Sequence, residues 1–272
     1  RIGNRSFGFS LQCFEYFFRY HMKTLLMLVL FLLGVNWSVL GQNKTDAAGR
    51  KQGPWIKYQS DGTTPLYTGT FKDDIPVGEF RYFYPNGKVK SVVQHETKTR
   101  TYVWFYFENE QMMSEGQYIN MLKDSLWKTY NNQGFLVSTE YYKNNRLNGE
   151  KRIYYLQNQL ERGELKIAQL ETYKDSVLHG PHSTYFSSGK LKDNGRYENG
   201  LKVGVWETYH PEGQVATNLK FRKGKAYGYC IAYDENGAEM YRSYWLEGKS
   251  LKGEDLKKYF QQCEKNGITP EE

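Results

Sequence analysis

The chain has 272 residues, enough for one large domain or two small ones, and its 37 basic and 30 acidic side chains give a formal net charge of +7. The charges are mixed along the chain without a basic block, which argues against nucleic-acid binding. Aromatic residues make up 17% of the sequence, although the mean hydropathy is only −0.76. Rings must therefore supply most of the apolar burial, and they suit a pleated sheet better than a leucine-packed helical core.

The N-terminal part of the chain has the features of a targeting segment. Residues 22–41 show the three parts of a secretory signal peptide: a basic start, an unbroken apolar run over 25–35, and small residues before a cleavage after Gly41. The run is shorter than the ~18 residues that span a membrane, so an uncleaved anchor is the less favoured alternative. We interpret residues 1–21 as an upstream extension that is foreign to the natural protein. The mature chain is then expected to start at Gln42, to be exported to the periplasm or beyond the cell, and to lack a transmembrane segment.

The rest of the chain is dominated by an internal repeat. Residues 42–52 are polar and without periodicity, which is typical of a linker, and residues 53–252 repeat at intervals close to 24 residues. The units open at Gly53, Gly78, Tyr102, Ser125, Gly149, Gly180, Gly204 and Gly228. Two positions further on lie Trp55, Phe80, Trp104, Trp127, Lys151, His182, Trp206 and Cys230. Five positions further on, every unit has an aromatic residue: Tyr58, Phe83, Phe107, Tyr130, Tyr154, Tyr185, Tyr209 and Tyr233.

Turn signals divide each unit into two strands. Asn-Gly pairs favour tight type I′ turns, because both central residues of such a turn need positive φ. Such pairs include Asn86-Gly87, Asn148-Gly149, Asn199-Gly200 and Asn236-Gly237. Two turns in ~24 residues leave two strands of roughly 6–9 residues, so each unit is one β-hairpin. We therefore predict an all-β fold: an elongated antiparallel meander of about eight hairpins and sixteen strands, in which a ladder of rings joins neighbouring units.

One geometric question stays open at this point. The ring columns at positions two and five have opposite strand parity. They either face opposite sides of the sheet or are separated by a bulge. The fifth interval, which is stretched to 31 residues by an insertion within 161–173, indicates either a longer hairpin or a binding loop.

Residues 253–272 form the predicted C-terminal helix and tail. Apolar residues at helical spacing predict an amphipathic helix there: Leu256, Tyr259, Phe260 and Cys263. An open sheet needs protection at its last edge, so we expect this helix to cap it; binding of a partner is the alternative. Cys230 and Cys263 would form a disulfide in an exported chain or stay as two free thiols, and the sequence leaves both open.

The sequence offers no catalytic motif. His179 and His182 are spaced like a metal pair, but no further His or Cys lies near them to complete a site. A phosphate-binding loop, HExxH and GxSxG are all missing from the sequence. We therefore expect no catalytic residues, no metal, no cofactor and no enzymatic activity.

The repeat unit resembles a known family. Its pattern G-x-W-x-x-Y-x-x-x-G, with a later Y-x-x-G, is similar to the MORN repeat, and most similar to the bacterial variant of the YwqK-type antitoxin proteins. The segments GVWETYHPEGQ, GPWIKYQSDGT, GEFRYFYPNGK and GPHSTYFSSGK carry the resemblance, which covers about 53–252. It implies a long antiparallel meander used for contact with proteins and sometimes lipids, and in the antitoxin-like members the neutralisation of a toxin.

The sequence as a whole predicts an exported, non-catalytic scaffold that binds a protein partner. The alternatives are a module that binds envelope glycans or lipid headgroups through exposed rings and positive charge, and the antitoxin of a toxin–antitoxin pair.

Overall fold

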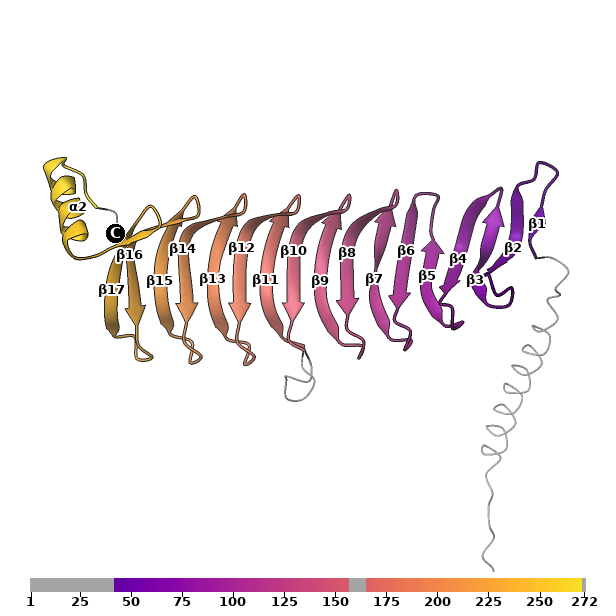
Figure 1. Cartoon of the computed structure of the whole chain (residues 1–272), viewed down its shortest axis with the longest axis horizontal. Helices are drawn as coiled ribbons and strands as arrows, with labels where there is room; N and C mark the ends of the chain where they lie inside the picture. Colours follow the sequence, from indigo (N-terminus) through magenta and orange to yellow (C-terminus); the bar gives the residue numbers. More distant parts are fainter. Residues whose placement is uncertain (1–41, 157–164, 271–272) are drawn as a thin grey trace, which may run out of the picture.

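The computed structural model describes residues 42–156 and 165–270, which form one open antiparallel sheet of eighteen strands followed by a single helix (Figure 1). Each strand pairs with its neighbours in the sequence, so the sheet is one layer that grows in chain order. The predicted meander is confirmed, and the short strands β1 and β18 add two strands to the sixteen expected. The predicted signal peptide and upstream extension lie outside the described residues.

The strands are β1 (Lys44–Thr45), β2 (Lys51–Tyr58), β3 (Pro65–Lys72), β4 (Ile75–Phe83), β5 (Val89–His95), β6 (Arg100–Tyr106), β7 (Met112–Ile119), β8 (Leu122–Tyr130), β9 (Leu136–Lys143), β10 (Arg146–Tyr154), β11 (Ile167–Lys174), β12 (Val177–Tyr185), β13 (Leu191–Glu198), β14 (Leu201–Tyr209), β15 (Val215–Arg222), β16 (Lys225–Tyr233), β17 (Glu239–Leu246) and β18 (Lys249–Leu251). The helix α2 spans Gly253–Lys265. The extra residues of the fifth unit lengthen the connection between β10 and β11, where 157–164 lie outside the described residues.

Two kinds of turn alternate along the chain. Most connections at one edge of the sheet are two-residue turns; in Asn199-Gly200 both residues have positive φ, 49° and 79°. This is the type I′ geometry, whose twist matches that of the strands. Longer loops join the strands at the other edge. In the loop after β4 the Tyr84 N–H donates to the Lys88 carbonyl at 2.8 Å, and the Gly87 N–H donates to the Tyr84 carbonyl at 2.9 Å.

Only one of the four Asn-Gly pairs forms the tight turn predicted for it. Asn199-Gly200 does so, whereas Asn86-Gly87 and Asn236-Gly237 lie in the longer loops, where the glycine alone has positive φ. Asn148-Gly149 lies inside β10, beside a shift of register. Other pairs, such as Asp73-Asp74 and Asn120-Met121, make the remaining tight turns.

The glycine that opens a unit lies inside a strand, at a β-bulge. Gly204 has φ 68°, and the register of β13 against β14 shifts beside it. Glycine supplies the positive φ of such a bulge without strain. Ser125 takes the same conformation in β8, with φ 61°. In β6, however, Tyr102 stands at this place, and the pairing of β6 with β5 runs on without a shift.

Because β6 has no bulge, the third unit is offset by one residue from the alignment made on the sequence. Val103, not Trp104, is the residue paired with Gly116 on β7, and it is only 2% exposed. Tyr106, not Phe107, ends the strand in the way that Tyr130 ends β8. Trp104 therefore faces the side of the sheet opposite to the other members of its column, and Phe107 lies in the following loop.

The two ring columns lie on opposite faces of the sheet, which answers the question of parity. Trp127, at position two, lies over Gly116. Lys128 and Tyr130 both reach Glu115, which is next to Gly116 in β7 and so points the other way. We call the side of Trp127 the core face and the side of Tyr130 the open face.

On the core face, rings are packed over glycines of the preceding strand. A Cβ atom at Gly116 would lie 2.3 Å from the Trp127 ring, so no larger residue fits beneath that ring. The same arrangement recurs in Gly69 with Phe80 and in Gly195 with Trp206. This close approach lets a single layer of sheet bury Trp127 to 3% exposure.

Lysines cover the core-face tryptophans from the other side. Lys123 Nζ lies 4.2 Å from the centre of the Trp127 ring and 5.0 Å from that of Tyr142. The equivalent groups are Lys51 with Trp55 and Phe71, and Lys202 with Trp206 and Phe221. Each contact between a cation and a ring is worth about 0.5–1 kcal/mol near a surface.

The middle of the core face is polar. In the fifth unit Lys151 takes the ring position, and its Nζ lies 3.2 Å from Glu140. Glu171 is paired across the strands with both Lys151 and His182, and His182 Nε2 lies 3.3 Å from Asp193. A charged network thus separates two ring-lined parts of the ladder.

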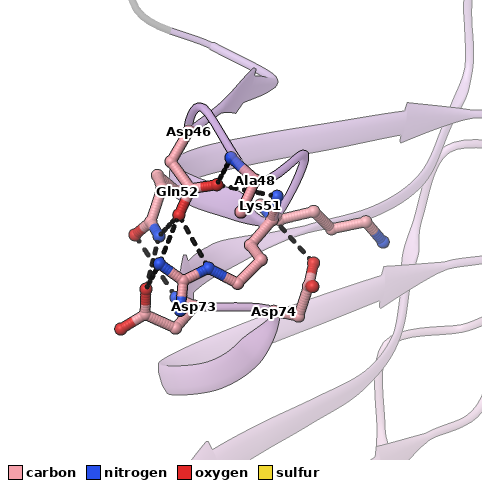
Figure 2. A network of polar contacts seen from close by, with 7 residues as sticks. Asp46, Ala48, Lys51, Gln52, Asp73 and Asp74 are labelled. Carbon is pink, nitrogen blue, oxygen red and sulfur yellow. Dashed lines mark hydrogen bonds and ion pairs between the residues drawn. The ribbon is translucent and has the colours of Figure 1, made fainter.

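The N-terminal edge is closed by β1 and a network of polar contacts (Figure 2). The Arg50 Nε–H donates to the Asp46 carboxylate at 2.8 Å. A terminal guanidinium nitrogen of Arg50 lies 3.2 Å from the carboxylate of Asp73, which is part of the turn between β3 and β4. The Lys51 N–H donates to Asp74 at 2.8 Å. Residues 42–52, which we expected to form a linker, are thereby joined to the sheet.

The C-terminal edge is covered in part by α2, which packs on the open face. Tyr244 of β17 contacts the rings of Tyr259 and Phe260, at 5.5 and 5.1 Å between ring centres. Cys263, on the same helix, is buried. Cys230 is paired with Ser243, the neighbour of Tyr244, and so points to the core face. Both cysteines are free thiols in this structure.

Candidate binding surface

Cross-strand pairing aligns one residue from each strand from β2 to β17 into a straight row on the open face. The members of this mixed row are Ile56, Thr68, Arg81, Val92, Trp104, Glu115, Lys128, Thr139, Arg152, Leu170, Ser183, Asn194, Glu207, Asn218, Ile231 and Arg242. At ~4.8 Å between strands, the row is roughly 70 Å long. Most of its members are polar or charged.

A second, mostly apolar row runs parallel to the mixed row, next to the longer loops. Its rings are the last residues of the even strands: Tyr58, Phe83, Tyr106, Tyr130, Tyr154, Tyr185, Tyr209 and Tyr233. Their paired residues on the following strands are Pro65, Val89, Met112, Leu136, Ile167, Leu191, Val215 and Glu239. We call these two sets together the aromatic band. Tyr58 is 46% exposed and the other rings are half-buried.

The longer loops hold successive rings of the aromatic band in position. The Tyr84 hydroxyl donates to the Tyr106 carbonyl at 2.7 Å, and the Tyr155 hydroxyl donates to the Tyr185 carbonyl at 2.6 Å. In both cases the first residue of one loop bonds the backbone of the band ring in the next unit. These bonds tie each unit to its neighbour and keep the spacing of the rings regular.

Glu115 is the centre of the densest polar cluster on the open face. It accepts hydrogen bonds from Tyr102 at 3.0 Å, Tyr130 at 2.9 Å and Lys128 at 3.0 Å. Burial by itself would raise the pKa of Glu115, but these donors hold that pKa below its usual value. Burial and the Glu115 carboxylate raise the pKa of Tyr102 to about 12. The cluster therefore stays as a carboxylate with neutral phenols over a wide range of pH.

Two shallow hollows interrupt the open face. The first has a volume of about 410 Å³, and among its lining residues are Trp104, Tyr106, Val92, Glu79, Arg81 and Glu110. The second, of about 340 Å³, lies near the C-terminal end and is lined in part by Val205, Asn218, Lys220, Tyr229, Ile231 and Arg242. Both are hollows in the same face, about ten strands apart.

The two histidines that resembled a metal pair bond different partners. His182 binds Asp193, and His179 Nδ1 accepts the Asn199 N–H at 3.4 Å. Among residues 42–156 and 165–270, no group of three or more His, Cys, Asp or Glu side chains is placed to hold a metal ion. No helix in the same two ranges is long and apolar enough to cross a membrane.

Two segments match a family model, that of the MORN repeat variant, over residues 76–96 and 202–222. Each segment covers most of an even strand, a longer loop and the following strand, which is one hairpin of the meander. No curated protein matches the chain. The hairpin meander and the two matches support a MORN-repeat protein, and such repeats suggest a module that binds proteins or associates with membranes.

Proposed function

We propose that the chain is an exported, non-catalytic scaffold that binds a protein partner along the aromatic band. The observation that carries the proposal is the length of the band: over sixteen strands, half-exposed rings alternate with side chains that are apolar in every place but that of Glu239. In the described part of the chain no second sheet covers them. Monomeric proteins rarely leave long apolar surfaces uncovered, and such surfaces mark sites of interaction.

The composition of the band suits a protein interface. Seven of its eight rings are tyrosines, and the eighth is Phe83. Tyrosine is enriched among the residues that contribute most of the binding energy at protein interfaces. The mixed row beside the band supplies a polar rim, as protein interfaces require. A rigid sheet also presents these side chains with little loss of conformational entropy on binding.

The test is a comparison of captured partners between matched variants. Tyr58, Tyr185 and Tyr233 sample the length of the band, and replacing all three with Ser removes its rings at three separate units. Tyr82 and Tyr241 are exposed rings on the core face, so the double Ser variant is the control. Envelope extract is passed over each immobilised protein, and bound partners are identified and their affinities measured after purification.

The proposal expects one partner that binds the wild type and the core-face control but not the band variant, while circular dichroism shows all three folded. Equal binding by the band variant would overturn it. The antitoxin alternative predicts a different result, because an antitoxin meets its toxin in the cytoplasm. Recovery of the uncleaved chain from the cytosol with a bound toxin would favour that alternative.

A further inference from the structure

We propose that the hollow around Trp104 is a binding site for an uncharged sugar ring. Trp104 is the one aromatic member of the mixed row, whose other fifteen residues are aliphatic, polar or charged. It is half-buried and lines the larger of the two hollows on the open face. The hollow overlaps the proposed protein-binding surface at Tyr106 and along the mixed row, but the sugar proposal concerns a different ligand and stands or falls on its own test.

The placement of Trp104 follows from the missing bulge in β6. In the first, fourth and seventh units the tryptophan lies on the core face, covered by a lysine and, in the fourth and seventh, packed over a glycine. In the third unit Tyr102 stands in place of the opening glycine, and the strand keeps its register with β5. The residues after Tyr102 therefore face the side of the sheet opposite to that of their counterparts in the other units. Val103 then fills the core face, and Trp104 points to the open face. At this unit the core face therefore has a valine where other units have an aromatic ring, and the open face has an additional tryptophan.

The surroundings of Trp104 form a platform with a polar rim. The Tyr102 ring lies 4.7 Å from that of Trp104, between ring centres, and Tyr106 lies two residues further along the strand on the same face. Val92, paired directly with Trp104, is buried beside it. The hollow has a volume of about 410 Å³, within the ~300–1,000 Å³ that is typical of sites for small ligands.

The charges at the rim of the hollow are already balanced. Glu79 and Arg81 form an ion pair at 2.6 Å, and Glu110 lies 3.7 Å from Lys88. A phosphate, an anionic headgroup or an acidic peptide would find no unpaired cation among these four residues. An uncharged ligand that offers both donors and acceptors suits them better, because carboxylates accept and a guanidinium donates hydrogen bonds.

A sugar has both an apolar surface that fits the Trp104 ring and hydroxyl groups that can donate and accept hydrogen bonds at the rim. The C–H groups on one side of a pyranose ring form an apolar face that can lie against the indole of Trp104, while the hydroxyl groups at its edge reach Glu79, Arg81 or Glu110.

The test is a titration of the exported chain with defined oligosaccharides, in which binding is measured by calorimetry and by tryptophan fluorescence. Cellotetraose and chitotetraose are the uncharged probes, and tetragalacturonic acid is the acidic comparison. We expect at least one uncharged tetraose to bind and the acid to bind at least ten-fold more weakly. Trp104→Ala should weaken binding at least ten-fold, and Trp104→Phe should retain part of it.

Tyr82→Ala, which removes an exposed ring from the core face, is the matched control and should bind like the wild type. Arg81→Ala changes an exposed side chain at the rim and should also weaken binding, so the proposal stays testable even if Trp104→Ala does not fold. The absence of binding by both uncharged probes, or equal binding by the wild type and by folded Trp104 and Arg81 variants, would overturn the proposal.

Discussion

The two faces of this sheet use the same kind of side chain for different purposes. On the core face, Trp127 is packed over Gly116 and under Lys123, so both sides of the ring are covered. On the open face, Tyr185, the last residue of β12, is only half-buried. The difference teaches that the glycines, more than the rings themselves, decide which face of a one-layer sheet becomes its core.

Loss of a core-face ring should give the largest change in stability. We expect Trp127→Ala to lower the free energy of unfolding by about 3–5 kcal/mol, because a buried ring and its contacts with Tyr118 and Tyr142 on the two neighbouring strands are lost. Tyr185→Ala on the open face should cost clearly less. Denaturation by urea, read from the midpoint and slope, checks the difference; equal effects would contradict the distinction between the faces.

Filling the space under a ring should have the next largest effect. Gly116→Ala places a methyl group 2.3 Å from the Trp127 ring, and we expect a cost of about 1–3 kcal/mol from overpacking. Gly189→Ala is the control, since nothing lies within 4 Å of the added atom and only its positive φ of 91° opposes the change. Gly116 itself has no positive φ, so its cost must come from the contact with the ring, and a Gly116→Ala variant as stable as the wild type would contradict this packing.

Removal of a lysine should have a smaller effect. Lys123→Met keeps the aliphatic part of the side chain but removes the cation over Trp127, and we expect a loss of about 0.5–1 kcal/mol. Lys128→Met removes a lysine from the open face without changing the contacts of the core-face rings, and its loss of stability is compared with that of Lys123→Met. Measurement in low and high salt should show that most of the loss at Lys123 survives screening, because the contact is direct.

The polar cluster of the open face should add a modest dependence on pH. The pKa of Glu115 is lowered in the folded chain, so its contribution to stability is present above its ordinary value of 4.5 and is lost as the pH falls through the folded value. The pKa of Tyr102 is raised to about 12, so its contribution is present below pH 10 and is lost as the pH rises toward 12. Glu115→Gln should flatten both limbs of the profile, and an unchanged profile would exclude the cluster as their source.

Much of the fold could be predicted from the sequence because the signal is repeated. The period near 24 residues and the turn residues are sufficient for a meander of hairpins. The apolar spacing around Leu256 and Phe260 was sufficient for the helix. Alignment on the sequence alone places the third unit one residue out of step, because Tyr102 stands where other units have a bulge and β6 pairs with β5 without one. A missing glycine alone does not reveal the offset, because Ser125 forms the bulge in the fourth unit without one.

The binding surface could be predicted only in part. The ring column at position five was visible in the sequence, but its place on the open face depends on the register of every strand pair. The glycines under the core-face rings also had a pattern that was overlooked: Gly69, Gly116 and Gly195 each stand two residues before an aromatic residue. Their role depends on a ring one strand away, which spacing within a single strand does not show.

The direction of the strands has a mechanical consequence. Every strand lies across the long axis of the sheet, as Figure 1 shows, so a force between the two ends would pull neighbouring strands apart sideways. Such a load breaks the hydrogen bonds of a strand pair in succession, like a zipper, instead of shearing the whole ladder at once. Each hairpin that opens would release about 24 residues of chain. A protein anchored at both ends would thus act as a soft, stepwise extensible tether, with its steps set by the repeat.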